Sequence, residues 1–220
     1  SMDKDFEASV VRSLSAIIEN NHIYYGSKPV HWCIESESAL AEAEVEYKDV
    51  ISDAVDVLFK ISDQKAFKND LSLESIKDDI YCCIWTTTPW TLPANQAIAV
   101  GADINYVLIK VDNKCIIIAD DLKNIFIDKV MNKKSSKNIL KSFRGKCLLA
   151  YKAEHPFYEK IVPIITADHV TTENGTGLVH IAPGHGQDDY IAGLKNNLEV
   201  FNPVNDKGLF VDSLELFGGL

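Results

Sequence analysis

A run of hydroxyl side chains between two apolar segments is the part of this 220-residue chain best suited to do chemistry. Residues 86–95 carry four threonine hydroxyls and one amide, and the flanking runs 80–85 and 96–101 are typical of buried strands. Pro89 and Pro93 remove two backbone donors, so we expect no helix to run through the segment. The sequence predicts a stiff polar loop at a strand end that orients a substrate or a water. Such hydroxyls also commonly cap stray backbone groups, and the loop holds no strong base.

A second informative run spans residues 175–190, where an apolar strand ends at His180 and a Pro/Gly-rich loop follows. A helix should begin near Asp188 and Asp189. Asp188 is expected to be a routine N-cap residue of this helix. Asp189 is then either a complement to the helix dipole or a functional acid. His180 is either a satisfied histidine at a strand end or a site residue.

Metal ligation is the alternative use of the second run, because it gathers four ligand types, His180, His185, Asp188 and Asp189. Pro183 and Gly184 interrupt the spacing, so the two imidazoles cannot share a helical face, and we expect no metal site. The cysteines form an odd set without disulfide-framework spacing, and we expect them to be reduced and structural: Cys33, Cys82, Cys83, Cys115 and Cys147.

Composition limits the possible partners and locations. The net charge of −10 argues against a protein that binds a nucleic-acid duplex through many phosphate contacts, although it permits contact with one end of an RNA. No apolar run approaches the roughly 18 residues that cross a bilayer, so we expect no membrane contact. Residues 1–2 resemble a cloning remnant rather than a signal peptide.

Hydrophobic periodicity predicts many short strands and few helices. Helical spacing indicates an amphipathic first helix over 3–20 and another after Asp120, and a period of two favours a strand over 39–47. The further expected strands cover 55–61, 106–111, 114–119, 147–150, 161–167 and 177–181, with a hairpin at Asp112-Asn113. The lysine- and serine-rich stretch 132–141 reads as a solvated loop or an RNA contact.

We therefore expect a mixed α/β, mainly β fold, a closed or nearly closed β-barrel with peripheral helices. Residues 1–50 would form a leading helix and an extended connecting segment. Residues 51–220 would form the barrel core with its helical insertions.

Three phrases of the sequence resemble one family, the editing domain (connective polypeptide 1) of bacterial-type isoleucyl-tRNA synthetases. They are Lys-Pro-Val-His-Trp-Cys at 28–33, continued by an Ala/Glu-rich phrase, Trp-Thr-Thr-Thr-Pro-Trp-Thr-Leu-Pro-Ala-Asn at 85–95, and Gly-Thr-Gly-x-Val-His-x-Ala-Pro-Gly-His-Gly at 175–186. Valyl and leucyl relatives carry an arginine where this chain has Thr88. Many relatives have a second cysteine shortly after the first, which is missing after Cys33.

The resemblance implies a β-barrel fold and hydrolysis of mischarged Val-tRNA(Ile), with valyl-adenylate as a second candidate substrate. A pocket selected for isoleucine cannot strongly reject valine, and this enzyme is the standard illustration of that limit. The family's His-x-Gly-His and Lys-Met-Ser-Lys-Ser motifs do not occur here, so we expect an excised insertion that does not activate amino acids. ATP and Mg would serve only a separate synthetic domain, and editing would need no cofactor.

Site roles follow from the same resemblance. The catalytic positions would be Thr87, Thr88, Thr91 and Asp189, and the substrate-binding positions Trp85, Thr86, Asn95, His180 and Asp189. Asp189 would bind the α-ammonium of the misattached amino acid, and His180 would exclude isoleucine. The expected partners are the acceptor end of tRNA(Ile) carrying valine and the rest of the parent synthetase, in the cytoplasm, with the isolated domain a monomer.

Three other hypotheses remain open at this point. The chain could be a binding module that presents residues 86–95 without catalysis. It could be a metal-dependent hydrolase that uses His180 and Asp189. It could also bind only free amino acid or adenylate analogues and need its parent enzyme to act on RNA.

Overall fold

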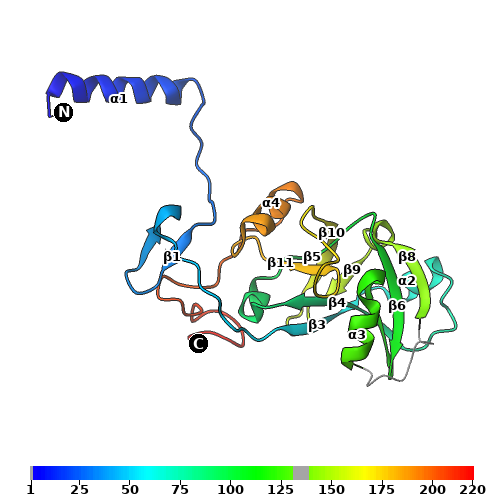
Figure 1. Ribbon diagram of the computed structural model, residues 1–220. Helices are drawn as coiled ribbons and strands as arrows, with labels where there is room; N and C mark the ends of the chain where they lie inside the picture. Colours follow the sequence, from blue (N-terminus) through cyan, green and yellow to red (C-terminus); the bar gives the residue numbers. More distant parts are fainter. Residues whose placement is uncertain (1, 131–138) are drawn as a thin grey trace.

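The computed structural model describes residues 2–130 and 139–220, whose arrangement is shown in Figure 1. The α-helices are α1 (Lys4–Glu19), α2 (Gln64–Asp70), α3 (Lys123–Val130) and α4 (Gln187–Lys195). The strands are β1 (His31–Cys33), β2 (Ser38–Leu40), β3 (Val55–Ile61), β4 (Asp79–Thr86), β5 (Ala97–Val100), β6 (Asn105–Val111), β7 (Lys114–Ala119), β8 (Ile139–Arg144), β9 (Lys152–Glu154), β10 (Ile161–Thr166) and β11 (Leu178–Ile181). Short 3₁₀ helices are η1 (Glu42–Glu44), η2 (Pro89–Ala94), η3 (Asp120–Leu122) and η4 (Gly145–Leu148).

One large mixed sheet dominates the molecule, with the strand order β11-β5-β10-β9-β3-β4-β7-β6-β8. The pairs β5–β10 and β4–β7 are parallel, and the other neighbouring pairs are antiparallel. Strands β1 and β2 form a separate antiparallel hairpin. The expectation of a mixed α/β, mainly β fold is confirmed.

The expectation of a closed barrel is wrong, because the sheet curls without closing. Edge strand β11 lies against β4, and the Ala119 amide at the end of β7 donates to the Thr176 carbonyl (2.8 Å). However, although β4 pairs with β7 only over Asp79–Cys82, no ladder forms between β11 and the rest of β4 within the described residues. Within residues 2–130 and 139–220, no ladder joins β11 to β8, the strand at the other edge.

Strand β5 is buried along its whole length because both faces of the sheet are covered there. Ile98 and Val100 point into the main core, while Ala97 and Ala99 point to a smaller cluster that includes Ala192 of α4. This explains why its sequence is continuously apolar rather than alternating. The strand therefore fixes the positions of its neighbours β10 and β11 and of helix α4.

Several local predictions are confirmed. The strand over 55–61 has the predicted bounds, and β6 and β7 form the predicted hairpin, with Asp112 in the left-handed region (φ 51°). The first helix forms α1, and the helix after Asp120 begins as η3 and continues as α3. The stretch 132–141 lies mainly outside the described residues, and its last three residues begin β8.

Other local predictions are wrong. The period of two over 39–47 predicts a strand, but only Ser38–Leu40 is one, and Glu42–Glu44 forms a 3₁₀ turn as the Ala/Glu propensity favours. Residues 147–150 form the end of the 3₁₀ helix η4 and a turn, and Gly145 at the start of η4 packs against the Gly101 backbone. The proline-containing segment 86–95 does hold a helix, of the short 3₁₀ type, which tolerates Pro89 at its first position.

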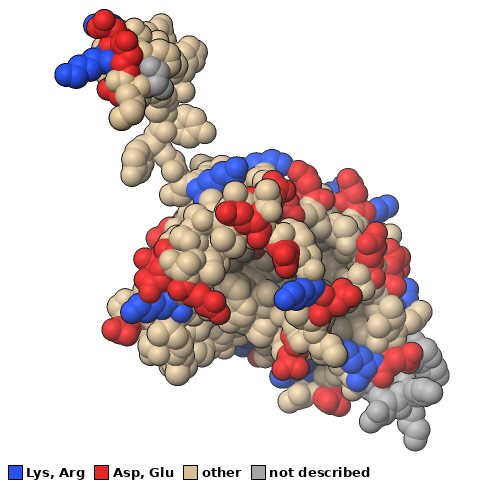
Figure 2. Space-filling model, turned by 60° about the vertical axis from the view of Figure 1, so that its left-hand side comes forward, with Lys and Arg blue, Asp and Glu red and all other residues tan. Residues whose placement is uncertain are grey.

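Helix α1 stands away from the sheet at the end of an extended segment (Figures 1 and 2). Its predicted apolar stripe is present but exposed to solvent, with Phe6, Val10 and Leu14 all 48–55% exposed. In Figure 2, acidic and basic side chains intermingle over the visible face. In the described ranges, none of the helices combines the length and the apolar character needed to cross a membrane.

Candidate functional site

The two informative sequence runs meet at one end of the main core. Alternation along β4 places Thr86 on the same face as Ile84 and Cys82, which belong to that core. His180 on β11 pairs with Ile98 of β5, so its side chain also lies on the core-facing side. The structure therefore brings residues of the threonine segment and of the second run together.

A direct side-chain contact joins the two runs. Thr91 Oγ1 of η2 lies 2.9 Å from Nε2 of His180. The Thr91 hydroxyl also donates to the Thr88 carbonyl (2.9 Å), and its single proton is thereby used. It therefore accepts from His180, which fixes the Nε2–H tautomer and leaves the Nδ1 lone pair free for a substrate donor.

The environment of His180 keeps its imidazole neutral. The side chain is buried, and burial, with the neighbouring His185 and His155, lowers its pKa to about 4. Its Nδ1 atom has no hydrogen-bond partner among the described residues. A buried acceptor without a partner is uncommon in folded proteins and calls for an explanation, such as a bound water or a functional role.

Asp189 is hydrogen-bonded to the backbone of the loop that follows His180. It lies in the first turn of α4, and its Oδ2 accepts from the Ala182 amide (2.8 Å), two residues after His180. Its other oxygen, Oδ1, lies 3.6 Å from Nε2 of His169, which follows β10. Burial raises the pKa of the Asp189 carboxyl, while the Ala182 amide and His169 oppose that shift. Asp188, by contrast, is exposed.

The first three threonines have unequal environments. Thr86 is buried, and its Oγ1 accepts from the Thr88 amide (3.0 Å). This hydroxyl therefore caps a backbone group of the loop, which is the structural role that the sequence left open for it. The Thr88 hydroxyl lies 3.3 Å from Thr86 Oγ1 and is exposed. Thr87 is exposed, and its hydroxyl makes no hydrogen bond with another described residue. The Thr87 hydroxyl is thus free for a ligand, and the Thr88 hydroxyl, with one long contact, is also exposed.

Trp85 and Asn95 flank this arrangement. Trp85 lies on the face of β4 opposite to Thr86 and packs against Gly175, where a Cβ would come within 3.0 Å of the indole. Gly175 has a φ of +76°, so the turn before β11 depends on glycine for its conformation as well as for space. Asn95 is buried and donates to the Ala97 carbonyl, while its Oδ1 has no partner among the described residues.

Sequence reasoning missed a second support of the threonine segment, the turn between β9 and β10. His155 Nε2 lies 3.1 Å from the Leu92 carbonyl, and its Nδ1 faces the Tyr158 amide (3.3 Å). Nδ1 therefore accepts and Nε2 carries the proton. The Lys160 ammonium donates to the Asn95 carbonyl (2.6 Å). Only the strand-end position of His155 could have suggested its role, since the contact spans 63 residues.

Replacing His155 is expected to destabilise the threonine segment. His155→Ala removes a buried ring, takes one of two donors from the Leu92 carbonyl, which keeps the Asn95 amide, and leaves the Tyr158 amide without a partner, at a cost of about 2–5 kcal/mol in the free energy of unfolding. His155→Gln can still donate to the Leu92 carbonyl and should lose clearly less, whereas the shorter His155→Asn should not. Urea unfolding of the three variants checks this. Equal losses in the Gln and Asn variants would exclude the Leu92 contact as the cause.

Stability is expected to fall in mild acid. Burial lowers the pKa of both His155 and His180 from 6.5 to about 4, so the unfolded chain binds more protons across this window. The free energy of unfolding should therefore decrease from about pH 6.5 to pH 4, by up to about 3 kcal/mol per histidine. Asp189, whose pKa is raised by burial, acts in the opposite direction. Urea unfolding at pH 7 and 4.5 measures the change, and His155→Gln should reduce it.

Metal ligation has little geometric support. Among the residues that the structure describes, no group of three or more His, Cys, Asp or Glu side chains is placed to hold a metal ion. His185 turns toward Trp90 instead, with ring centroids 5.1 Å apart. Burial raises the pKa of the Cys82 thiol, which is therefore not a nucleophile near neutral pH.

Comparison with known proteins gives close relatives by sequence. The chain is 46% identical to the isoleucine–tRNA ligase of Shewanella pealeana over 223 aligned residues, which cover 100% of this chain and 24% of the relative. It is 47% identical to that of Francisella tularensis subsp. novicida, over 99% of this chain and 23% of the relative. The chain thus matches a segment of isoleucine–tRNA ligases and spans about a quarter of their length.

Solved structures with a similar fold are editing domains of leucyl enzymes. GlLeuRS-CP1 superposes with a TM-score of 0.54 at 16% identity, over 62% of this chain and 57% of that one. The P. knowlesi cytosolic leucyl-tRNA synthetase editing domain gives 0.52 at 16% identity, over 62% and 59%. A family model described as tRNA synthetases class I (I, L, M and V) matches residues 1–199. The chain therefore belongs to the class I tRNA synthetase family, as a segment similar to part of isoleucine–tRNA ligases.

Proposed function

We propose that this chain is an aminoacyl-tRNA editing hydrolase, which removes valine wrongly attached to tRNA(Ile). The observation that carries the proposal is the junction at the end of the main core. There the Thr91–His180 contact joins an imidazole to the threonine segment, and the Asp189–Ala182 contact holds a carboxylate at the loop that follows His180. The similarity to isoleucine–tRNA ligases and the editing-domain fold support it.

The substrate dictates what such a site must provide. Valine differs from isoleucine by one methylene, which a pocket chosen for isoleucine cannot strongly discriminate against, so a second site must admit valine and reject isoleucine. The α-ammonium needs a carboxylate, and Asp189 Oδ1 has no hydrogen-bond donor among the described residues. His180 can accept a second ammonium proton at Nδ1 while its ring walls the pocket.

The reaction is direct attack of water on the ester carbonyl. The described residues of the junction include no Ser-His-Asp or Cys-His pair, and the Thr91 hydroxyl is engaged on both sides. Thr91 therefore acts by holding His180, whereas Thr87 and Thr88 bind the terminal ribose or position the water. The substrate's own ribose hydroxyl can assist. The residues that support the site without touching the substrate directly are Trp85, Thr86 and Asn95.

The partners follow from the same proposal. The acceptor end of tRNA(Ile) carrying valine enters this site, and valyl-adenylate is a second candidate substrate. The remainder of a larger isoleucine–tRNA ligase holds the transfer RNA body, as the net charge of −10 here suggests, and covers the exposed apolar stripe of α1. The parent enzyme acts in the cytoplasm, its ATP and Mg serve the synthetic site alone, and the isolated chain is a monomer.

Deacylation of tRNA(Ile) mischarged with valine tests the proposal. The chain, alone or within its parent enzyme, is expected to release valine, and a chelator should change the rate little. Loss of activity with the chelator would favour a metal-dependent hydrolase instead. Binding of the mischarged RNA without release of valine would identify a non-catalytic binding module.

A further inference from the structure

His169 is a partly buried histidine that the proposed reaction does not use. It follows strand β10, and its Nε2 atom lies 3.6 Å from Oδ1 of Asp189. That nitrogen is buried and has no hydrogen-bond partner among the described residues. A buried polar atom in this state calls for an explanation, and the neighbouring carboxylate supplies one.

The turn that carries His169 is fixed to helix α4 on both sides of the ring. On one side, Lys195 of α4 donates to the Asp168 carboxylate (2.6 Å). On the other side, Val170 is buried in the small apolar cluster that also includes part of α4. Asp189 lies on the same helix, so packing of the turn against α4 sets the distance between the imidazole and the carboxylate.

The carboxylate determines which imidazole nitrogen carries the proton. An ionised carboxylate only accepts hydrogen bonds, so a neutral His169 ring presents its N–H at Nε2 to Asp189 and keeps its lone pair at Nδ1. At 3.6 Å the contact is electrostatic and is longer than a hydrogen bond. The lone pairs of Oδ1 therefore stay available to the ammonium of a substrate, while Oδ2 is engaged by the Ala182 amide (2.8 Å).

The ring of His169 also separates Asp189 from a second cavity. This cavity has a volume of about 440 Å³, and its lining includes His169, Asp188 and Lys195 but not Asp189. The His169 side chain is 24% exposed although its Nε2 atom is buried. One edge of the ring thus faces the cavity and the other edge faces Asp189. The imidazole therefore keeps water in the cavity away from the carboxylate.

We infer that His169 is a positioning residue for Asp189, which holds the carboxylate ionised and available to the α-ammonium of the substrate and closes the cavity behind it. Burial raises the pKa of Asp189, and the imidazole opposes that shift. Without a donor at this place, the carboxylate would take up a proton more readily, and a protonated acid binds an ammonium poorly. This inference rests on the proposed function, because the ammonium belongs to that function's substrate.

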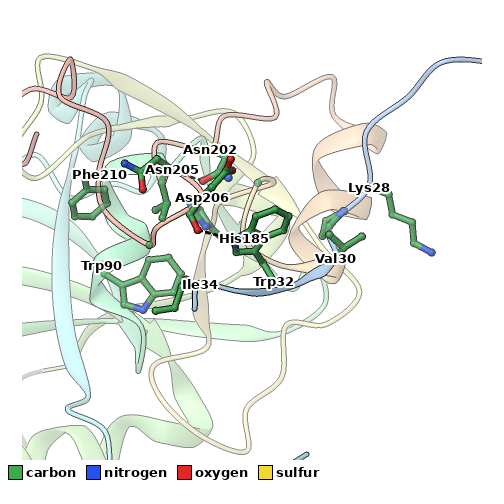
Figure 3. Close-up of a pocket in the computed structure, with 14 residues that line it drawn as sticks. Lys28, Val30, Trp32, Ile34, Trp90, His185, Asn202, Asn205, Asp206 and Phe210 are labelled. Carbon is green, nitrogen blue, oxygen red and sulfur yellow. Dashed lines mark hydrogen bonds between the residues drawn. The ribbon is translucent and has the colours of Figure 1, made fainter. Parts of the chain in front are cut away.

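The other charged or titratable groups on the elements around Asp189 act differently. Asp188 carries the same charge and raises the pKa of Asp189. His185 lines a different cavity, of about 700 Å³, where it lies beside Trp90 (Figure 3). The remaining groups already have partners, Lys195 with Asp168 and His180 with Thr91.

Titration of the Asp189 carboxyl carbon by NMR in the 220-residue chain tests the inference, with Asp189→Asn identifying the signal. His169→Phe keeps the bulk that closes the cavity but removes the donor, so the titration midpoint of Asp189 should rise by about one pH unit. His169→Gln can present an amide N–H near the place of Nε2 and should restore most of the wild-type midpoint. Asp168→Asn, in the same turn, is the control and should leave the midpoint unchanged. Amide spectra at each pH monitor folding.

The comparison of the Phe and Gln variants decides the outcome. A midpoint that stays the same or falls in His169→Phe would overturn the inference. An equal rise in both variants would also overturn it, because the donor would then have no effect. If His169→Phe folds poorly, His169→Met is used instead, since it also keeps apolar bulk and offers no donor.

Kinetics give a second readout that a purely structural residue would not change. The acid limb of kcat/KM for release of valine should move to higher pH together with the Asp189 midpoint. His169→Phe should therefore lose up to about 10-fold below that midpoint and little at about pH 8. The loss should appear mainly in KM, because the ammonium is bound in the ground state and the transition state alike. An equal loss at every pH would identify His169 as structural and overturn the inference.

The titration does not depend on hydrolysis. If the chain releases no valine but the Asp189 midpoint responds as expected, the proposed function fails and the pairing of His169 with Asp189 stands. If valine is released and the midpoint does not move in His169→Phe, the editing proposal stands and His169 has no part in it.

Discussion

Asp189→Ala should lower kcat/KM for release of valine from mischarged tRNA(Ile) about 30-fold or more, which corresponds to the roughly 2–5 kcal/mol lost when one partner of a buried charge pair is removed. The carboxylate is half-buried and is held by the Ala182 amide, so it is positioned before the substrate arrives. Losing that backbone contact costs about 1 kcal/mol of stability and should leave the fold intact. Deacylation rates and thermal unfolding of the variant measure both effects.

Two further variants separate charge from structure. Asp188→Ala removes an exposed acid from the same helical turn, and its rate should stay within about twofold of wild type. Asp189→Asn keeps an acceptor for the Ala182 amide but removes the charge, so it should be as stable as wild type and as inactive as the alanine variant. An active Asp189→Asn chain would show that the ammonium is bound elsewhere.

His180→Ala should let the site hydrolyse correctly charged Ile-tRNA(Ile). The imidazole is buried and is held at Nε2 by Thr91, so it cannot swing aside for a longer side chain. Removing it opens space for the extra methylene, whose discrimination is worth about 10–200-fold in a well-fitted pocket. The ratio of the rates for valyl and isoleucyl RNA is expected to fall toward one.

Matched variants keep this prediction testable if the alanine chain folds poorly. Thr91→Val preserves shape but removes the hydrogen bond to His180, so selectivity should weaken without being lost. His180→Gln keeps most of the bulk and should keep most of the selectivity. Unchanged discrimination in a folded His180→Ala chain would remove His180 from the assigned role.

The sequence predicts the local structure around the candidate site best where its signals are local. Residues 86–95 are stiffened by their own prolines, and the strand-loop-helix pattern around His180 needs no distant partner. Helical position alone does not distinguish Asp189 from Asp188; the resemblance singles out Asp189, and in the structure the Ala182 amide sets it apart. His155 escaped detection for a similar reason, since its partner at Leu92 lies in another part of the chain.

The fold shows the same difference between local features, which the sequence predicts, and long-range contacts, which it does not. Strands such as β3, β6 and β7 are recognisable because each is a short apolar segment, with β6 and β7 continuously apolar at their centres. Barrel closure depends on hydrogen bonds between strands far apart in the sequence, and no ladder joins β11 to β4 or β8 within the described residues. Side-chain patterns carry no information about that pairing.

The contact between Thr91 and His180 spans 89 residues, and this separation has a consequence for synthesis on the ribosome. At about 5–20 residues per second, η2 and the apolar strand β5 emerge roughly 5–20 s before β11 and α4 can reach them. During that interval β5 lacks both β10 and β11, and its apolar surface is exposed to other chains. We therefore expect the nascent polypeptide to be prone to aggregation while this stretch is being translated.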